Sequence, residues 1–160
     1  MPLKPKAIEW GTFYLLLTVY IIVCLISIMD YLWFQVVIFG HAVQILFFII
    51  LLFGLIMRFI IQKQLGKYYD ANIKIWDDHK LINQGIYKYI RHPMYLSNII
   101  IFLGIAGIFS SVLGIISVFI FIVPSLMARI FLEEKYLLQK FGNNYQLYID
   151  ETKRFLPGIW

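Results

Sequence analysis

The sequence predicts an all-α integral membrane protein with about four transmembrane helices, formed by a single domain over residues 1–160. Hydrophobic residues make up 61% of the chain and charged residues only 14%, whereas a soluble domain carries about 25% charge. Three long stretches, residues 10–29, 31–57 and 92–128, contain no Asp, Glu, Lys or Arg. A membrane span needs about 20 apolar residues, and the chain is too short for two full domains.

Each of the first two stretches fits one helix, and the third is too long for one. The segment "GIFSSVLG", residues 107–114, divides the third stretch, because Gly and Ser mark a turn. The predicted transmembrane helices therefore cover residues 11–29, 34–60, 94–109 and 112–131.

The basic residues predict the orientation of these helices. All fourteen Lys and Arg lie before the first helix, within residues 58–91, or within residues 129–154. By the positive-inside rule, both termini and the 58–91 loop are expected in the cytoplasm. The net charge of +5 then reflects contact with anionic lipid headgroups and requires no nucleic-acid partner.

Two cytoplasmic segments, residues 62–95 and 129–160, can carry chemistry. In the second, large apolar and aromatic residues recur at helical spacing: Leu137, Phe141, Tyr145 and Tyr148. This spacing predicts an amphipathic helix on the membrane surface. Gly142 is expected to cap and interrupt the helix, and Pro157 is expected to end it.

Several polar residues near the predicted membrane boundary have a purely structural reading as well. Arg129 and Glu133, four residues apart on a helix, can form an ordinary ion pair while Arg129 reaches the interface. Pro93, after Arg91 and His92, can simply start a helix, since its missing N–H costs nothing in the first turn.

The remaining polar residues in the apolar stretches are expected to be structural. His41 and Gln44 should bond a neighbouring helix, and the lone Cys24 should pack. The three His residues are far apart without zinc-like spacing, so no metal is expected.

Read together, five short motifs resemble the isoprenylcysteine carboxyl methyltransferase family, part of a wider group that includes the phospholipid methyltransferases. The resemblance covers about residues 72–160, the predicted catalytic region, and its motifs bracket an apolar hairpin. The motifs are H-x-L-[VI] at 79–82, G-[IVP]-Y at 85–87, R-H-P-x-Y at 91–95, R-x-x-x-E-E at 129–134 and F-G-x-x-Y-x-x-Y at 141–148. Ser97 stands where the family usually has Gly.

The resemblance implies a cytosolic pocket for S-adenosyl-L-methionine, formed by the 62–95 loop and the C-terminal helical segment. The matching cofactor positions are His79, Leu81, Ile82, Tyr87, His92, Pro93, Met94, Tyr95, Glu133 and Glu134, with Asn72 as a further candidate. Arg129 matches the arginine that family members use towards the substrate. Arg129 and Glu133 are the predicted catalytic residues.

These residue types suit methyl transfer. Glu133 can pair with the cofactor ammonium, while His92 and Tyr hydroxyls can hydrogen-bond its carboxylate and ribose. A carboxylate acceptor needs no general base, so the protein mainly has to align the reactants. Arg129 can anchor such a carboxylate. The expected acceptor is lipophilic and enters from the bilayer, and the resemblance ranks an isoprenylcysteine-like carboxylate above a phospholipid amine or a small thiol.

Two other function classes remain open from the sequence. One is an NADPH-dependent membrane reductase of the sterol and steroid type, which shares an R-H-P-x-Y-like motif. Those reductases tend to continue with Gly-Glu, where this chain has Ser97-Asn98. The other is a non-catalytic membrane subunit, which would bind neither cofactor.

Overall fold

The computed structural model describes residues 7–34, 39–66 and 81–155, and their regular structure is helical. The long helices are α1 (Ala7–Phe34), α2 (His41–Leu65), α3 (Pro93–Ile108) and a continuous helix of three parts: α4 (Val112–Ser117), the π-helical η3 (Val118–Ile122) and α5 (Val123–Phe141). Two short helices complete the set, η2 (Gly85–Lys88) and α6 (Asn143–Glu151).

Within the described residues, three helices are long and apolar enough to cross a membrane: Gly11–Trp33, His41–Leu65 and Val112–Phe141, with mean hydropathies of 2.4, 2.6 and 2.4. The third predicted helix, α3, is also apolar but has only 16 residues. At 1.5 Å per residue it is about 24 Å long, shorter than the roughly 30 Å hydrocarbon core. The expected multi-pass membrane architecture is confirmed.

The ends of the first two helices differ from the prediction. α1 covers Ala7–Phe34 and so continues past residue 29, and the charged Asp30 within it finds partners in the fold. The Asp30 carboxylate accepts a 2.6 Å hydrogen bond from the Ser111 hydroxyl and a 3.3 Å bond from the Leu113 N–H. α2 covers His41–Leu65, whereas 34–60 was predicted. It lies between two glycines, Gly40 and Gly66.

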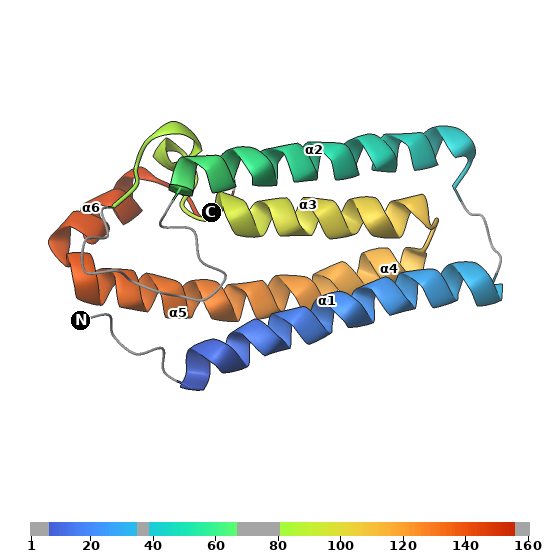
Figure 1. Ribbon diagram of the computed structural model, residues 1–160, viewed down its shortest axis with the longest axis horizontal. Helices are drawn as coiled ribbons and strands as arrows, with labels where there is room; N and C mark the ends of the chain where they lie inside the picture. Colours follow the sequence, from blue (N-terminus) through green and yellow to red (C-terminus); the bar gives the residue numbers. More distant parts are fainter. Residues whose placement is uncertain (1–6, 35–38, 67–80, 156–160) are drawn as a thin grey trace.

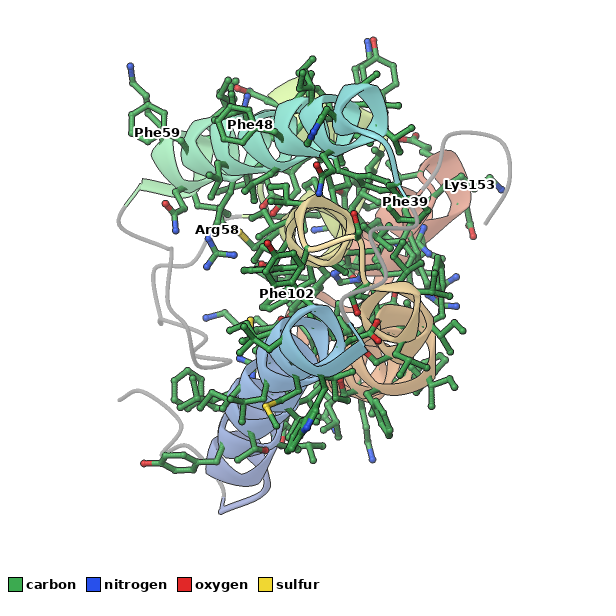
Figure 2. All side chains as sticks on the ribbon, turned by 90° about the vertical axis from the view of Figure 1, so that its right-hand side faces the viewer. Phe39, Phe48, Arg58, Phe59, Phe102 and Lys153 are labelled. Atoms are coloured by element: carbon green, nitrogen blue, oxygen red, sulfur yellow. The ribbon has the colours of Figure 1, made fainter. Side chains whose placement is uncertain are left out.

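α3 lies at the centre of the bundle, with α2 on one side and α1 and the long α4–α5 helix on the other (Figures 1 and 2). The approach of α2 and α3 is close, because a Cβ atom on Gly104 would lie 2.8 Å from the Leu51 backbone. Small residues permit such contact between membrane helices. On the outer side of α2, Phe48 and Phe59 point away from the bundle, as expected for contact with lipid (Figure 2).

α1 packs on the rest of the bundle through an apolar core and a polar link. The core consists of Leu16, Val23, Val118, Ile122 and Leu126. In the polar link, the Arg58 guanidinium of α2 donates to the side-chain oxygen Oδ1 of Asn98. The side-chain amide of Asn98 donates to the Tyr20 hydroxyl of α1 over 2.9 Å. Three helices are thereby joined by side-chain hydrogen bonds.

The turn predicted at 107–114 is present between α3 and α4. Ser111 caps α4, its hydroxyl accepting a 2.8 Å hydrogen bond from the Gly114 N–H. The Gln44 amide donates to the Ile108 carbonyl over 3.2 Å and to the Ser110 hydroxyl over 3.1 Å. The expectation that Gln44 bonds a neighbouring helix is confirmed, and His41, at the first position of α2, donates to Gln44 over 3.2 Å.

The opposite end of the bundle holds the start of α1, the end of α2, the start of α3, the end of α5 and all of α6 (Figure 1). Gly142 joins α5 to α6 with a φ of +53°, as the sequence predicts for a helix cap. α6 ends at Glu151, so the prediction that Pro157 ends it is wrong. The next residues leave the helix because their backbone pairs with residues 89–92.

Candidate functional site

The Arg91-His92-Pro93 motif forms the start of α3. Pro93 is the first helical residue and His92 the residue before it, so the simple structural reading of Pro93 is correct. The His92 carbonyl accepts hydrogen bonds of 3.2 Å from the N–H groups of Tyr95 and Leu96. The helix start therefore fixes the directions in which Arg91, His92 and Tyr95 leave the backbone.

A short parallel pairing joins this motif to the segment after α6. Ile90 and Lys153 form a parallel bridge. The Arg91 N–H donates to the Lys153 carbonyl over 2.7 Å, and the His92 N–H donates to the Arg154 carbonyl over 3.1 Å. The Arg91 guanidinium also donates to the carbonyls of Ile149, at 2.9 Å, and Thr152. Two segments far apart in the sequence thus become one unit.

Glu134 of α5 is the buried centre of that unit. Its Oε2 lies 2.7 Å from Arg154 Nη2, and Arg154 Nε contacts both carboxylate oxygens at 3.1 and 3.2 Å. Arg91 Nε and His92 Nε2 each donate to Oε1 over 3.2 Å. The hydrogen bond to Glu134 raises the pKa of Arg154. Both carboxylate oxygens are therefore occupied by protein partners, in charge-assisted bonds.

Glu133, one residue earlier, is more open. Its side chain is 29% exposed, and its Oε2 accepts a 2.6 Å hydrogen bond from the Tyr95 hydroxyl. His92 Nδ1 lies 4.0 Å from the same oxygen. Among the described residues no partner contacts Glu133 Oε1. This carboxylate thus has one oxygen held in place and one available to a ligand.

Arg129 is 4% exposed and lies in the helix interface. Its Nε donates to the Tyr95 hydroxyl over 3.1 Å, and its Nη1 lies 3.4 Å from the Thr12 hydroxyl of α1. The structural alternative of a direct pair with Glu133 is wrong within the described structure, since the Tyr95 hydroxyl of α3 lies between the two side chains and bonds to both. Arg129 therefore points into the bundle and not outward towards the lipid headgroups.

Three buried tyrosines lie where η2 meets α6. The Tyr148 hydroxyl donates to the Tyr87 carbonyl over 2.6 Å. The Tyr145 hydroxyl is also buried but has no hydrogen-bond partner among the residues that the structure describes. Burial raises the pKa of all three phenols, so they stay neutral at physiological pH. An unsatisfied buried hydroxyl indicates that a water or ligand can serve as its partner.

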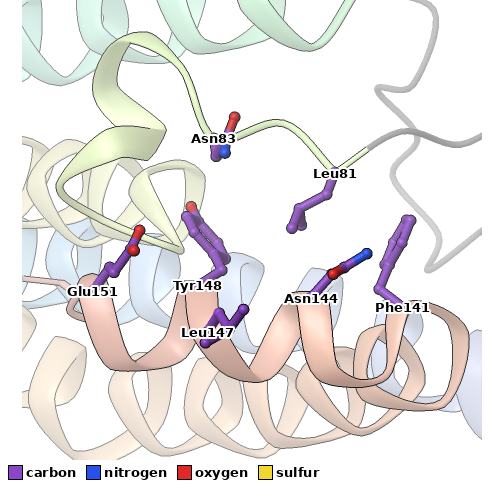
Figure 3. Close-up of a pocket in the computed structure, with 7 residues that line it drawn as sticks. All are labelled: Leu81, Asn83, Phe141, Asn144, Leu147, Tyr148 and Glu151. Carbon is purple, nitrogen blue, oxygen red and sulfur yellow. The ribbon is translucent and has the colours of Figure 1, made fainter.

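An open cavity of about 540 Å³ lies between the 81–83 segment and α6 (Figure 3). This size falls within the roughly 300–1,000 Å³ of small-molecule pockets. The lining residues are Leu81, Asn83, Phe141, Asn144, Leu147, Tyr148 and Glu151. The lining mixes apolar and aromatic side chains with amides and one carboxylate, as a site for a partly polar ligand requires.

The structure brings five of the predicted site residues together in two hydrogen-bonded groups, His92 with Glu134, and Tyr95 with Glu133 and Arg129. The two groups meet where His92 Nδ1 lies 4.0 Å from Glu133 Oε2. Pro93 and Met94 form the first turn of α3 next to it. Tyr87 is joined to α6 through Tyr148, Leu81 lines the cavity, and Ile82 is half-buried beside it in the chain. His79 and Asn72 lie outside the described residues.

Several residues of the site were not predicted, among them Arg91, Tyr145 and Arg154. Tyr145 carried a signal, because it lies in the helical repeat of apolar and aromatic residues after 137 and therefore had to face inward. No sequence pattern predicted the pairing of Arg154 with Glu134, because this contact depends on how the segment after α6 folds back onto residues 89–92.

The fold and the site define a multi-pass integral membrane protein with a cluster of ionisable side chains where its helices end. The model of the isoprenylcysteine carboxyl methyltransferase (ICMT) family matches residues 44–139, more than half of the chain. The chain belongs to this family, which confirms the resemblance of its motifs. Proteins of the family use S-adenosyl-L-methionine.

Individual relatives agree with this membership. The chain is 32% identical over 82 residues to a protein-S-isoprenylcysteine O-methyltransferase of Schizosaccharomyces pombe, covering 51% of this chain. It is 35% identical over 83 residues to one of Dictyostelium discoideum, covering 52% of this chain. The matched segment spans 35% of the length of each relative.

A solved structure shows the same fold. It is that of the eukaryotic intramembrane Ras methyltransferase ICMT, with a TM-score of 0.76 and 23% identity. The superposition covers 88% of this chain and 52% of that chain.

The residues present fit the family's cofactor. S-adenosyl-L-methionine carries an ammonium, a carboxylate, ribose hydroxyls and an adenine ring. Glu133 has a carboxylate oxygen without a protein partner in the described structure, and Tyr145 has a buried hydroxyl in the same condition. Both kinds of atom form hydrogen bonds with such groups.

Proposed function

We propose that this protein is an S-adenosyl-L-methionine-dependent methyltransferase that acts on a lipophilic acceptor. The observation that carries the proposal is the arrangement of Glu133, with one oxygen bonded to Tyr95, the other open, and His92 beside it. Membership of the ICMT family supports the same conclusion.

The cofactor would be held by groups from three parts of the chain. Glu133 binds the ammonium through a charge-assisted hydrogen bond. His92 donates one ring N–H to Glu134, which leaves Nδ1 directed to the Glu133 side for a polar group of the cofactor. The apolar and aromatic lining of the cavity near Leu81 and Phe141 suits the adenine ring. When bound, the cofactor supplies an electrophilic methyl group.

Arg129 would hold the acceptor. A guanidinium binds a carboxylate through two parallel hydrogen bonds, which fixes its position and direction. Tyr95 and Thr12 orient Arg129 from α3 and α1. An isoprenylcysteine-like acceptor can keep its tail among the apolar helices while its carboxylate reaches Arg129. Because a carboxylate is already a nucleophile, alignment is the main task of the protein.

We place the site on the cytoplasmic side of the membrane, together with both termini. Every Lys and Arg of the described residues lies in the half of the bundle that contains the site (Figure 1). Basic residues in short loops favour the cytoplasm. Labelling a single cysteine at Lys88→Cys, with Cys24 replaced by Ser, tests this in right-side-out and inverted vesicles. Reaction only in inverted vesicles is expected, and reaction only in right-side-out vesicles would reverse the orientation.

Calorimetry on the purified protein in detergent tests the function. Binding of S-adenosylhomocysteine and no binding of NADPH are expected, followed by transfer of a labelled methyl group to farnesylcysteine. Phosphatidylethanolamine and a small thiol are the parallel acceptors. Binding of NADPH alone would identify a reductase instead, and binding of neither would indicate a non-catalytic subunit. Methylation of another acceptor alone would correct the substrate and keep the reaction class.

A further inference from the structure

The segment after α6, residues 152–154, contacts the R-H-P motif through both its backbone and a side chain. Its backbone pairs with residues 90–92, and its Arg154 guanidinium contacts both oxygens of Glu134. Arg154 is half-buried, and its guanidinium also lies 5.0 Å from the centre of the Phe131 ring. The side chain is therefore fixed by α5 on one side and by its own backbone pairing on the other.

Glu134, held by Arg154, in turn constrains the ring of His92. A carboxylate only accepts hydrogen bonds, so the 3.2 Å contact of Glu134 Oε1 with His92 Nε2 places a proton on Nε2. The other ring nitrogen, Nδ1, is then the one that lies 4.0 Å from Glu133 Oε2. The orientation of the ring and the nitrogen that carries the proton both depend on where Glu134 is held.

We propose that Arg154 is a positioning residue, which acts through Glu134 to hold His92 in the orientation that the cofactor site needs. The segment after α6 is therefore a part of the binding site although it need not touch the cofactor. This inference rests on the proposed function, because it assumes that the group held by His92 and Glu133 is S-adenosyl-L-methionine.

The test compares three variants of the whole protein in detergent. Arg154→Gln removes the charge and the fork of N–H donors, and Arg154→Lys keeps the charge alone. Lys135→Gln is the control, since it removes the same charge from an exposed side chain next to Glu134. Affinity for S-adenosylhomocysteine is measured by calorimetry, which separates the dissociation constant from the number of sites. A variant that merely unfolds loses sites, and its remaining sites keep their affinity.

For Arg154→Gln we expect affinity to fall roughly fivefold or more. The variant removes the charge-assisted hydrogen bonds to Glu134, and Glu134 in turn holds His92 of the proposed cofactor site. Arg154→Lys should lie between this variant and the wild type, and Lys135→Gln should match the wild type. Nitrogen NMR of histidine-labelled protein supplies a second measurement. The wild type should show His92 protonated at Nε2, whereas Arg154→Gln should show a smaller share of protonation at that nitrogen.

The outcomes separate this inference from the proposed function. Wild-type protein that binds no S-adenosylhomocysteine would overturn the proposed function and this inference with it. Wild-type binding with unchanged affinity in Arg154→Gln would overturn the inference alone. An equal loss in Lys135→Gln would also overturn it, since the effect would then follow from net charge and not from the hold on Glu134.

Discussion

The Tyr95 hydroxyl donates a 2.6 Å hydrogen bond to Glu133, so a side chain of α3 fixes the carboxylate of a residue on α5. The same hydroxyl accepts a 3.1 Å hydrogen bond from Arg129. One phenol thus lies between the residue assigned to the cofactor and the residue assigned to the acceptor. In the proposed mechanism, the distance between the two reactants depends on this contact.

Tyr95→Phe should therefore impair cofactor binding and turnover together. A hydrogen bond to a charged group contributes about 1.5–3 kcal/mol, so affinity for S-adenosylhomocysteine should fall roughly tenfold or more. Turnover should fall further, because Arg129 loses its acceptor as well. The exposed Tyr89, which lies before the motif, provides the control Tyr89→Phe. Normal affinity in Tyr95→Phe would show that the contact does not orient Glu133.

The two adjacent glutamates should respond differently to the same substitution. Glu133→Gln should weaken S-adenosylhomocysteine binding by about tenfold and leave thermal stability near that of the wild type. Glu134→Gln should also weaken binding, because His92 loses its carboxylate partner. Unlike Glu133→Gln, it should lower the unfolding temperature as well, since it leaves Arg91 and Arg154 without their carboxylate. Calorimetry and thermal unfolding in detergent give both quantities. Equal effects of the two substitutions on the unfolding temperature would contradict the division of roles.

Arg129→Lys should lower turnover more than cofactor affinity. The charge is kept, but an ammonium cannot form the fork of two parallel hydrogen bonds to a carboxylate. A misplacement of about 1 Å in the reacting atoms can cost roughly a hundredfold in rate. Cofactor affinity and methyl transfer are measured on the same preparation. If both fall in parallel, Arg129 belongs to the cofactor site beside Glu133 and not to the acceptor.

The two tyrosines of α6 form a matched pair for stability. Tyr148→Phe removes the 2.6 Å hydrogen bond to the Tyr87 carbonyl, and an unpaired buried group costs about 1–3 kcal/mol. Tyr145→Phe removes a hydroxyl that has no partner in the described structure, so the protein without ligand should unfold at the same temperature or higher. Adding S-adenosylhomocysteine should stabilise Tyr145→Phe less than the wild type if this hydroxyl meets the cofactor or a water bound with it.

Gly104→Ala should destabilise the bundle by pushing α2 away from α3. The added Cβ would lie 2.8 Å from backbone atoms of Leu51, which cannot move without moving the helix. Gly11→Ala is the control, because a Cβ there meets nothing within 4 Å. Thermal unfolding should show a clear loss for the first substitution only. A stable Gly104→Ala protein would mean that α2 shifts easily.

Features that depend on local sequence were predicted well. The turn at Ser110 and Ser111 and the cap at Gly142 follow from residues that break or end helices. The motif around His92 and the pair Glu133-Glu134 came from family resemblance, and the structure places them together. Composition alone gave the apolar helices, since few other structures accommodate such long uncharged stretches.

Features that depend on distant contacts were not predicted. The first helix was predicted to end at residue 29, but it continues to Phe34, and Asp30 within it is bonded by a hydroxyl 81 positions away in sequence. The end of α6 was placed at Pro157, because the pairing of Lys153 with Ile90 leaves no trace in either segment alone. Nothing in the sequence distinguishes Arg154 from the other basic residues, and only the structure shows that it contacts Glu134.

The pairing of Ile90 with Lys153 also sets an order of events during synthesis. The apolar helices can enter the bilayer one after another as they leave the ribosome. The motif at the start of α3, however, must wait for the segment after α6 before Glu134 acquires its full set of partners. A nascent chain stalled between these two points would be inserted in the membrane yet lack a finished site. Premature termination within α6 should therefore yield a protein that reaches the membrane and stays inactive.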